Sequence, residues 1–240
     1  MNVDSAPAAR PDEPRRSLLR SPYAWVALSG IAVLTVLRVL FPPPAAPPIL
    51  GRVGEFQLVD TQGAPFGSGD LDGRPWIANL FFTRCGAICP QLMSATAGLA
   101  ERLVAARAPE VRIVSITVDP EHDTPETLRA YEKARSIDPT RWSLLSGSTE
   151  AVTAVVALGL RLGAGTPTAG PGGLIDIAHS GKLVVVDGGG CIRGYFDTDP
   201  PGLDAAFRTT LLVRSVPCEG SGLESSGLPG ATPASTAETR

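Results

Sequence analysis

Residues 51–216 alternate between short runs of apolar, β-branched residues and longer stretches in which apolar residues recur with a helical period. Such short runs indicate buried strands, whereas the helical period indicates helices that pack by one face. Thr124 is the expected N-cap of the second helix, and Ser148 or Thr149 starts the third. This order predicts an α/β, thioredoxin-like fold, with a central mixed β-sheet flanked by helices. The expected strands are residues 76–82, 111–118, 182–186 and 191–196, the last two joined as a hairpin, and the expected helices are residues 91–106, 125–136, 150–162 and 203–213.

A different pattern precedes this domain, because residues 23–41 form a nearly continuous apolar segment. Its length is close to the roughly 20 residues of a bilayer-crossing helix, and Arg38 lies near enough to its end to reach the interface. Arginines in the leader predict a cytoplasmic N-terminus, so we expect a single-pass protein of the cell inner membrane with its main domain in the periplasm. The alternative is a cleaved signal peptide, which the long leader and the absence of an Ala-x-Ala site disfavour. The expected organisation is a basic leader (1–22), a transmembrane anchor (23–41), a proline-rich linker (42–50), the thioredoxin-like domain (51–216) and a disordered tail (217–240).

Composition adds two constraints. The 240 residues are 43% hydrophobic, enough for one sizeable core, and a formal net charge of −3 gives no reason to expect nucleic-acid binding. Thiols outside the cytoplasm tend to end as disulfides. Cys191 in the expected hairpin and Cys218 in the polar tail are therefore interpreted as one stabilising disulfide or two idle thiols, without a catalytic role.

The sequence Cys85-Gly86-Ala87-Ile88-Cys89-Pro90 directly follows the first expected strand. Residues i and i+4 share one face of a helix, so both sulfurs can meet one metal ion or each other. A helix N-terminus favours thiolate, which is both the metal ligand and the nucleophile, and Pro90 fits the first helical turn. The alternative is an ordinary structural disulfide, although closing so small a loop stabilises little. The pattern predicts a redox or metal site.

The chain has two histidines that could complete a metal site. His179 is expected in the loop that enters the hairpin, beside the cysteine helix in a thioredoxin-like fold, and we interpret it as the third ligand. His122 is interpreted as solvent-exposed. Asp119, at the end of its strand, could point toward the cysteine helix and accept a hydrogen bond that supports a ligand, whereas Asp123 is expected with Thr124 to cap the following helix.

Two sulfurs and one nitrogen form a soft, low-coordinate set that suits Cu(I) and tolerates Cu(II). Zinc is the competitor, but structural zinc normally takes four ligands, and the sequence has no second Cys or His pair at zinc spacing. An open three-ligand site also suits transfer, because a partner's thiolate or imidazole can enter the vacant position. These residues therefore favour copper exchange.

Three blocks of the sequence resemble the Sco/SenC family: residues 81–90, residues 114–125, and His179-Ser180. The resemblance runs from about Gly54 to Phe207 and implies a membrane-anchored, thioredoxin-like protein with Cys85, Cys89 and His179 as copper ligands. It also implies copper delivery to, or reduction of the thiols of, the dinuclear CuA site of cytochrome c oxidase subunit II. A copper donor chaperone and a thiol reductant are the further partners that such a role implies.

The sequence departs from the usual family pattern beside its ligands. Many members have Pro and Asp where this chain has Gly86 and Ala87, and Asp where it has Ala178. The ligands remain, but a local negative charge is lost, and this loss bears on both the copper affinity and the choice of acceptor. The expected acceptor is the oxidase or another copper enzyme.

The competing functional class is an extracytoplasmic thiol–disulfide oxidoreductase that uses Cys85 and Cys89 without copper. An enzyme of the thioredoxin type normally carries Cys-x-x-Cys and a proline facing the thiols. This chain has three residues between its cysteines, and His179 stands where that proline would be. A peroxiredoxin is a third possibility, disfavoured by the spacing of the two cysteines.

Overall fold

The computed structural model describes residues 22–41, 45–86, 89–169, 175–215 and 218. The chain divides into two compact units, residues 1–45 and residues 46–240. The expected leader, residues 1–21 of it, lies outside the described residues, as does the expected tail apart from Cys218. The second unit accounts for most of the described residues.

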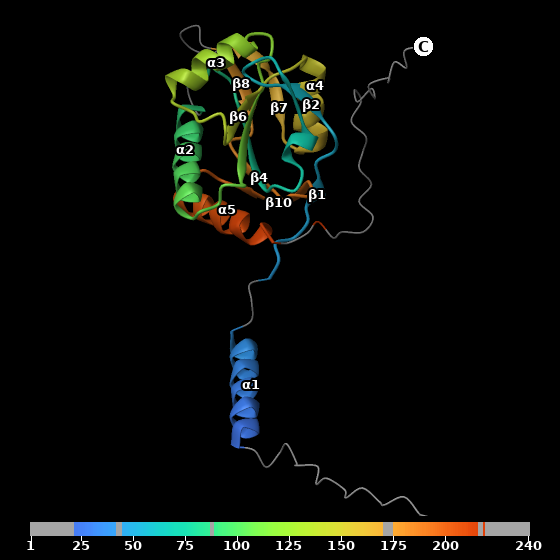
Figure 1. Cartoon of the computed structure of the whole chain (residues 1–240). Helices are drawn as coiled ribbons and strands as arrows, with labels where there is room; N and C mark the ends of the chain where they lie inside the picture. Colours follow the sequence, from blue (N-terminus) through green and yellow to red (C-terminus); the bar gives the residue numbers. More distant parts are fainter. Residues whose placement is uncertain (1–21, 42–44, 87–88, 170–174, 216–217, 219–240) are drawn as a thin grey trace, which may run out of the picture. The chain divides into compact units, whose positions relative to one another are not determined.

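The N-terminal unit contains helix α1 (Pro22–Leu40), which covers the segment expected to be a membrane anchor (Figure 1). Large apolar side chains of this helix are exposed, from 46% at Leu37 to 83% at Tyr23. Within the described part of the chain, no helix combines the length and the apolar character needed to cross a membrane. The expected transmembrane anchor is therefore not confirmed.

A six-stranded mixed sheet forms the centre of the second unit, with strand order β1-β10-β9-β4-β5-β6. Neighbours β4, β5 and β6 run parallel, whereas β9 is antiparallel to β4 and β10, and β1 is antiparallel to β10. This arrangement confirms the predicted thioredoxin-like α/β architecture. The strands are β1 (Gly51–Arg52), β4 (Trp76–Phe81), β5 (Arg112–Thr117), β6 (Trp142–Leu145), β9 (Leu183–Val186) and β10 (Cys191–Phe196).

In the described residues of the second unit, four α-helices flank this sheet: α2 (Cys89–Ala105), α3 (Pro125–Ala134), α4 (Thr149–Ala154) and α5 (Pro200–Val213). The predicted N-caps Thr124 and Ser148 are confirmed, because their side chains accept hydrogen bonds from backbone N–H groups three residues on. The third predicted helix is shorter than expected, since α4 passes into the π-helical turn η3 (Val155–Gly159). Helix α2 begins earlier than expected, so Cys89 is its first residue.

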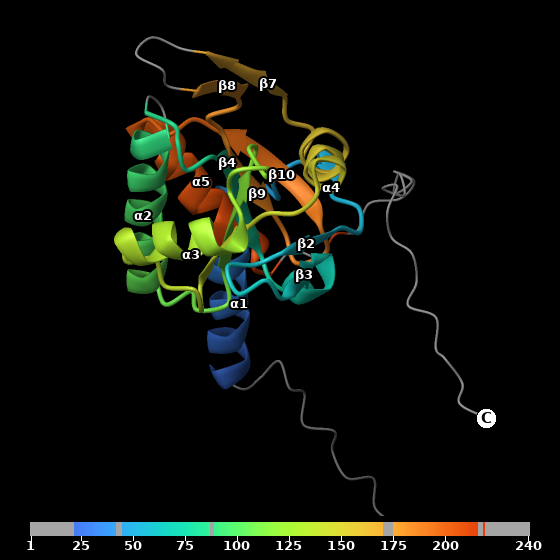
Figure 2. The same cartoon turned by 90° about the horizontal axis from the view of Figure 1, so that it is seen from above.

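Seven described elements were not among the predicted ones: strands β1 and β6 of the central sheet, four further strands and one 3-10 turn. Strand β6 extends the central sheet, and β2 (Gln57–Val59) pairs with β3 (Pro65–Gly67), which leads into a 3-10 turn, η2 (Ser68–Leu71). Strands β7 (Ala164–Ala169) and β8 (Ile175–His179) form a second hairpin (Figure 2). The prediction that His179 lies in a loop is wrong, because its backbone pairs with Ala164 at the end of β8.

Strand β4 is buried on both faces and organises the core. Ala78 and Leu80 pack with the α4–η3 segment on one face. Ile77 packs with apolar residues of α2 and α5 on the other face, and Phe81 packs there with Leu128 of α3. Burial on both faces explains the continuous apolar run of this strand. Its carboxyl end delivers the chain directly to Cys85.

Candidate metal and redox site

The two cysteines of the Cys85–Cys89 segment come together at the junction of β4 and α2. The Cys85 N–H donates to the Phe82 carbonyl at 3.3 Å, which turns the chain after the strand. The backbone N–H of Cys89, the first residue of α2, donates to Cys85 Sγ at 3.3 Å. Both residues are free thiols. The arrangement places Cys85 Sγ against the N-terminus of a helix, where backbone N–H groups favour negative charge.

The two thiols differ in accessibility. Cys85 is partly exposed, whereas Cys89 is only 1% exposed. Burial raises the pKa of Cys89 well above its ordinary value, and a hydrogen bond with the Cys85 side chain raises this pKa further. Because only Cys85 is accessible, it is the sulfur that an incoming partner reaches, and Cys89 lies buried behind it.

The surroundings of Cys89 bring β8 to the same place. Cys89 belongs to a buried apolar cluster with Phe81, Met93 and Ile177, and Cys85 packs against this cluster. Ile177 is 1% exposed and belongs to β8, two residues before His179. Figure 2 shows the β7–β8 hairpin at the same end of the domain as the start of α2. The strand carrying the predicted third ligand therefore adjoins the cysteines, while the His179 side chain lies outside the described residues.

Asp123 holds the segment just before Cys85 through hydrogen bonds to Thr83, a role that was not predicted. Its side chain is fully buried and accepts hydrogen bonds from the Thr83 N–H at 3.0 Å, from the Thr83 hydroxyl and from the Thr117 hydroxyl. The prediction that it caps α3 is wrong, because Thr124 is the N-cap. An Asp next to the start of a helix is typical of an N-cap. The neighbouring residues give no sign that its carboxylate instead accepts hydrogen bonds from a segment 40 residues away.

Asp119 faces Arg84, the residue before Cys85. It is 4% exposed, and its Oδ2 accepts from Arg84 Nε at 3.1 Å and from Nη2 at 2.6 Å. Its Oδ1 lies 2.9 Å from Nδ1 of His122. The His122 side chain is 53% exposed, which confirms its predicted exposure. Asp119 thus fixes an arginine next to the thiols, and its support of a ligand stays a prediction.

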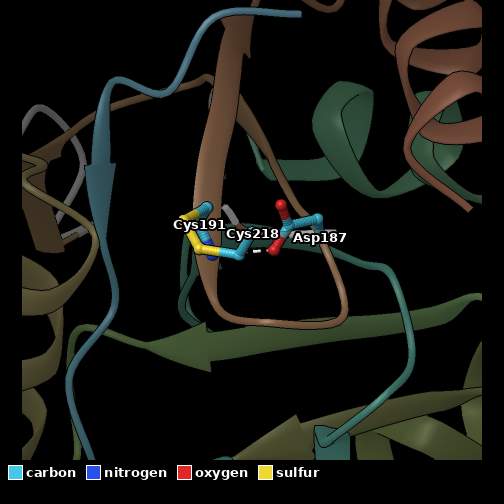
Figure 3. Close-up of side chains that lie close together, drawn as sticks. All are labelled: Asp187, Cys191 and Cys218. Carbon is cyan, nitrogen blue, oxygen red and sulfur yellow. Dashed lines mark hydrogen bonds between the residues drawn. A yellow bond between two sulfur atoms is a disulfide. The ribbon is translucent and has the colours of Figure 1, made fainter. Parts of the chain in front are cut away.

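The second cysteine pair is a disulfide. Cys191 and Cys218 are bonded, with their Cα atoms 5.8 Å apart, which decides between the two predicted alternatives. The Asp187 carboxylate lies beside them (Figure 3), and the three side chains form the group of potential metal ligands found among the described residues. The sulfurs bind each other, and Asp187 accepts from the Gly189 and Cys191 N–H groups and from Arg193. This group therefore has no free thiolate and is a structural one.

The same structural group holds both ends of the domain. Arg193 is 3% exposed, pairs with Asp187 and donates to the Pro47 carbonyl at 2.8 Å. Leu50 N–H donates to the Ile192 carbonyl at 2.9 Å, and Arg52 Nη2 donates to Cys218 Sγ at 3.1 Å. Pro47 and Leu50, from the expected proline-rich linker, are therefore fixed to β10. Cys218, which follows α5, is bonded to the same strand through Cys191.

Comparison with known proteins points to one family. The family model of SCO1/SenC matches residues 50–210. A Stutzerimonas stutzeri protein named as a candidate copper-binding protein is 33% identical over 186 residues, which cover 75% of this chain and 86% of the relative. The structure of a SCO1/SenC family lipoprotein from Bacillus anthracis matches with 26% identity and a TM-score of 0.62, over 70% of this chain and 99% of that one. Copper-bound ScoI from Bradyrhizobium japonicum matches with 26% identity and a TM-score of 0.58, over 68% and 99%.

Proposed function

This chain belongs to the SCO1/SenC family, and on that premise we propose that it binds copper through Cys85, Cys89 and His179. Its role would be to deliver copper to the CuA site of cytochrome c oxidase subunit II, or to another copper enzyme, or to reduce the thiols of that site. The observation that carries the proposal is the free dithiol at the start of α2, with one sulfur partly exposed and one buried.

The donor set fits copper. Two thiolates and an imidazole are soft ligands that suit Cu(I), and the apolar residues around Cys89 exclude water from one side of the sulfurs. In a strand, residues i and i+2 lie on the same face. Ile177 faces the cysteine cluster, which supports the assignment of His179 as the ligand from β8.

The exposure of Cys85 supports transfer rather than storage. A copper ion held by three ligands keeps a position that an acceptor's thiolate or imidazole can enter, and ligand exchange can begin at the accessible sulfur. Oxidation to a Cys85–Cys89 disulfide removes two electrons and two protons from the dithiol and withdraws both sulfur ligands. The redox state of the pair would therefore gate copper loading, and a thiol reductant would restore it.

An extracytoplasmic location completes the proposal. The Cys191–Cys218 disulfide is typical of an oxidising compartment, and one structural neighbour is named a lipoprotein. The exposed apolar surface of α1 needs a membrane or protein partner, so we propose that the N-terminal unit holds the domain at the membrane. Fractionation of the full chain and of a chain starting at Ala46 tests this, since only the full chain should sediment with membranes.

Copper titration of the reduced full chain, followed by competition with a Cu(I) chelator, tests the ligand assignment. One copper per chain is expected, Cys85→Ser and Cys89→Ser should abolish its retention, and His179→Ala should weaken binding while leaving a reversible dithiol. His122→Ala is the matched control, because it removes the other imidazole. Unchanged copper stoichiometry in the three ligand variants would contradict the assignment.

A thiol–disulfide oxidoreductase without copper is the second candidate function. The specific observation in its favour is the unequal exposure of the two thiols, which suits one attacking sulfur and one resolving sulfur. A chain that retains no copper but cycles reversibly between dithiol and disulfide would favour this candidate.

A further inference from the structure

A pocket of about 640 Å³ opens beside the cysteine segment. Arg84, which precedes Cys85, forms part of its wall, and the loop after β5, the α4–η3 segment and the start of β7 form the rest. Ala164 lines the pocket and is the register partner of His179. The pocket therefore adjoins both chain segments that carry the proposed copper ligands.

The floor of this pocket is apolar. Val118, Val152 and Val156 line it, and the two valines from the α4–η3 segment belong to the core of the domain. Thr153 and Ala157 line it from the same segment and are exposed. A floor of buried valines under exposed small residues offers apolar contact to a side chain from another molecule.

The rim is polar and carries a net negative formal charge. The guanidinium of Arg84 is neutralised by Asp119, to which His122 also bonds. Glu121 lines the same rim and is exposed, so its carboxylate gives the rim its excess negative charge. A basic side chain would complement this rim.

One wall has an irregular helical geometry. The Leu160 N–H donates to the Val155 carbonyl at 2.7 Å, five residues back, as in a π-helix. Insertions of this kind into α-helices occur frequently at functional sites. Here the wider turn carries Val156 and Ala157 to the pocket.

The remaining wall is a strand with an open edge. Strands β7 and β8 form a two-stranded sheet, so in the described part of the chain β7 is paired along one side. Ala164 and Gly165, at its start, are exposed and line the pocket. An open strand edge accepts backbone hydrogen bonds from an extended peptide, with side chains entering adjacent pockets.

We propose that this pocket docks an extended segment of the acceptor protein, with an apolar side chain over Val152 and Val156 and a basic side chain toward Glu121, directly beside the acceptor's own cysteine. The inference deepens the proposed function and depends on it for the identity of the acceptor. A volume of about 640 Å³ is larger than one thiol requires and matches a few side chains of a peptide. The pocket would thereby bring the acceptor's sulfur to Cys85.

Thiol–disulfide exchange with peptides tests the docking without copper. The thiolate of Cys85 attacks a symmetrical peptide disulfide, forms a mixed disulfide and releases one peptide thiol. The Cys89 sulfur then attacks the Cys85 sulfur and releases the second peptide thiol. The protein dithiol is thereby oxidised to a disulfide as the peptide disulfide is reduced. Two probes of equal length are used, one with Leu and Lys flanking its cysteine and one with Asp and Glu there. The full chain should react about tenfold faster with the first probe, as expected for burial of one leucine side chain.

Matched variants locate the effect. Ala157→Arg fills the pocket from an exposed position and should reduce the rate with the Leu–Lys probe to that of the other probe. Leu158→Arg is the control, because Leu158 is a neighbouring exposed residue that does not line the pocket, and this variant should keep the preference for the Leu–Lys probe. Glu121→Gln should lower the preference by about threefold, as for one screened charge pair of the rim. Equal rates with both probes in the parent chain, or a preference that survives Ala157→Arg, would overturn the docking proposal. Copper titration of the same variants separates the two proposals, because Ala157→Arg should bind copper like the parent.

Discussion

The two cysteine pairs of this molecule use the same chemical groups for opposite purposes. Cys85 and Cys89 are four residues apart, remain free thiols and sit at the start of a helix with one sulfur accessible. Cys191 and Cys218 are separated by 27 positions and are bonded beside a buried Asp187–Arg193 ion pair. The chain entropy that a disulfide removes grows with the loop it closes. The short pair is therefore suited to exchange partners, and the long pair to hold the chain.

The largest expected effect separates the pairs by copper binding. Replacing Cys85 with Ser should lower copper affinity by more than about 100-fold, because it removes a thiolate that no described neighbour replaces. The double variant Cys191→Ser/Cys218→Ser should keep the parent affinity. Chelator competition on the full chain measures both. Loss of copper in the double variant alone would reverse the roles assigned to the two pairs.

Stability should show the opposite pattern. Opening the Cys191–Cys218 bridge by the same double variant should lower the free energy of unfolding by about 3.5 kcal/mol, the chain-entropy value for a loop of this length. Oxidising Cys85 to Cys89 closes a far shorter loop and should raise it less. Urea unfolding of each form checks the difference, and equal effects would remove the distinction between holding and exchanging pairs.

Asp123 should matter to the short pair only. Asp123→Asn replaces an acceptor with an amide whose N–H₂ faces hydroxyl and N–H donors, and it should cost about 2 kcal/mol of stability. It should also loosen Thr83 and lower copper affinity, while the Cys191–Cys218 bridge forms as before. Glu126→Gln, at an exposed position of α3, is the control and should change stability by less than about 0.5 kcal/mol. Amide hydrogen exchange at Thr83 reports the loosening, and unchanged protection there would contradict the supporting role.

The smallest effect is a dependence on alkaline pH. Burial raises the pKa of Cys89 in the folded chain above its ordinary value of 9.0, because the buried site favours the neutral thiol. The stability that this thiol contributes is therefore complete below pH 9 and is lost as the pH rises toward the folded pKa. The slope should be at most about 1.4 kcal/mol per pH unit. Burial also raises the pKa of Tyr131 to about 12, from an ordinary value of 10.0, so the window between pH 9 and 10 isolates the cysteine.

Unfolding measured across that window should show the slope in the parent chain and not in Cys89→Ala. The long pair contributes none of it, because a disulfide does not titrate. A slope that persists in Cys89→Ala would assign it to other groups.

The sequence was informative wherever a pattern is local and strong. The apolar runs of β4 and β5 could be predicted as strands because nearly every residue in them is buried. The N-cap Thr124 could be predicted because its hydrogen bond lies within one helical turn. The cysteine spacing likewise predicted a pair that meets at a helix start, and the structure brings these two residues together.

The features that escaped prediction depend on contacts between distant segments. The β7–β8 hairpin includes Gly165 and Pro167, residues typical of loops, and β7 is a strand only because β8 pairs with it. Asp123 faces Thr83 across 40 positions, and no residue next to either one signals the contact. Partner choice for Cys191 was open for the same reason, since tertiary packing brings Cys218 to it.

The attachment of Pro47, Leu50 and Cys218 to the β10 hairpin has a mechanical consequence. Tension on the segment that enters the domain is first borne by backbone hydrogen bonds to β10 and by the buried Arg193, and tension on the departing segment is borne by a covalent bond. Load applied through either end is therefore taken up on β10 before it can reach β4 or the start of α2. The thiols can keep a constant geometry while the segments outside the domain are pulled.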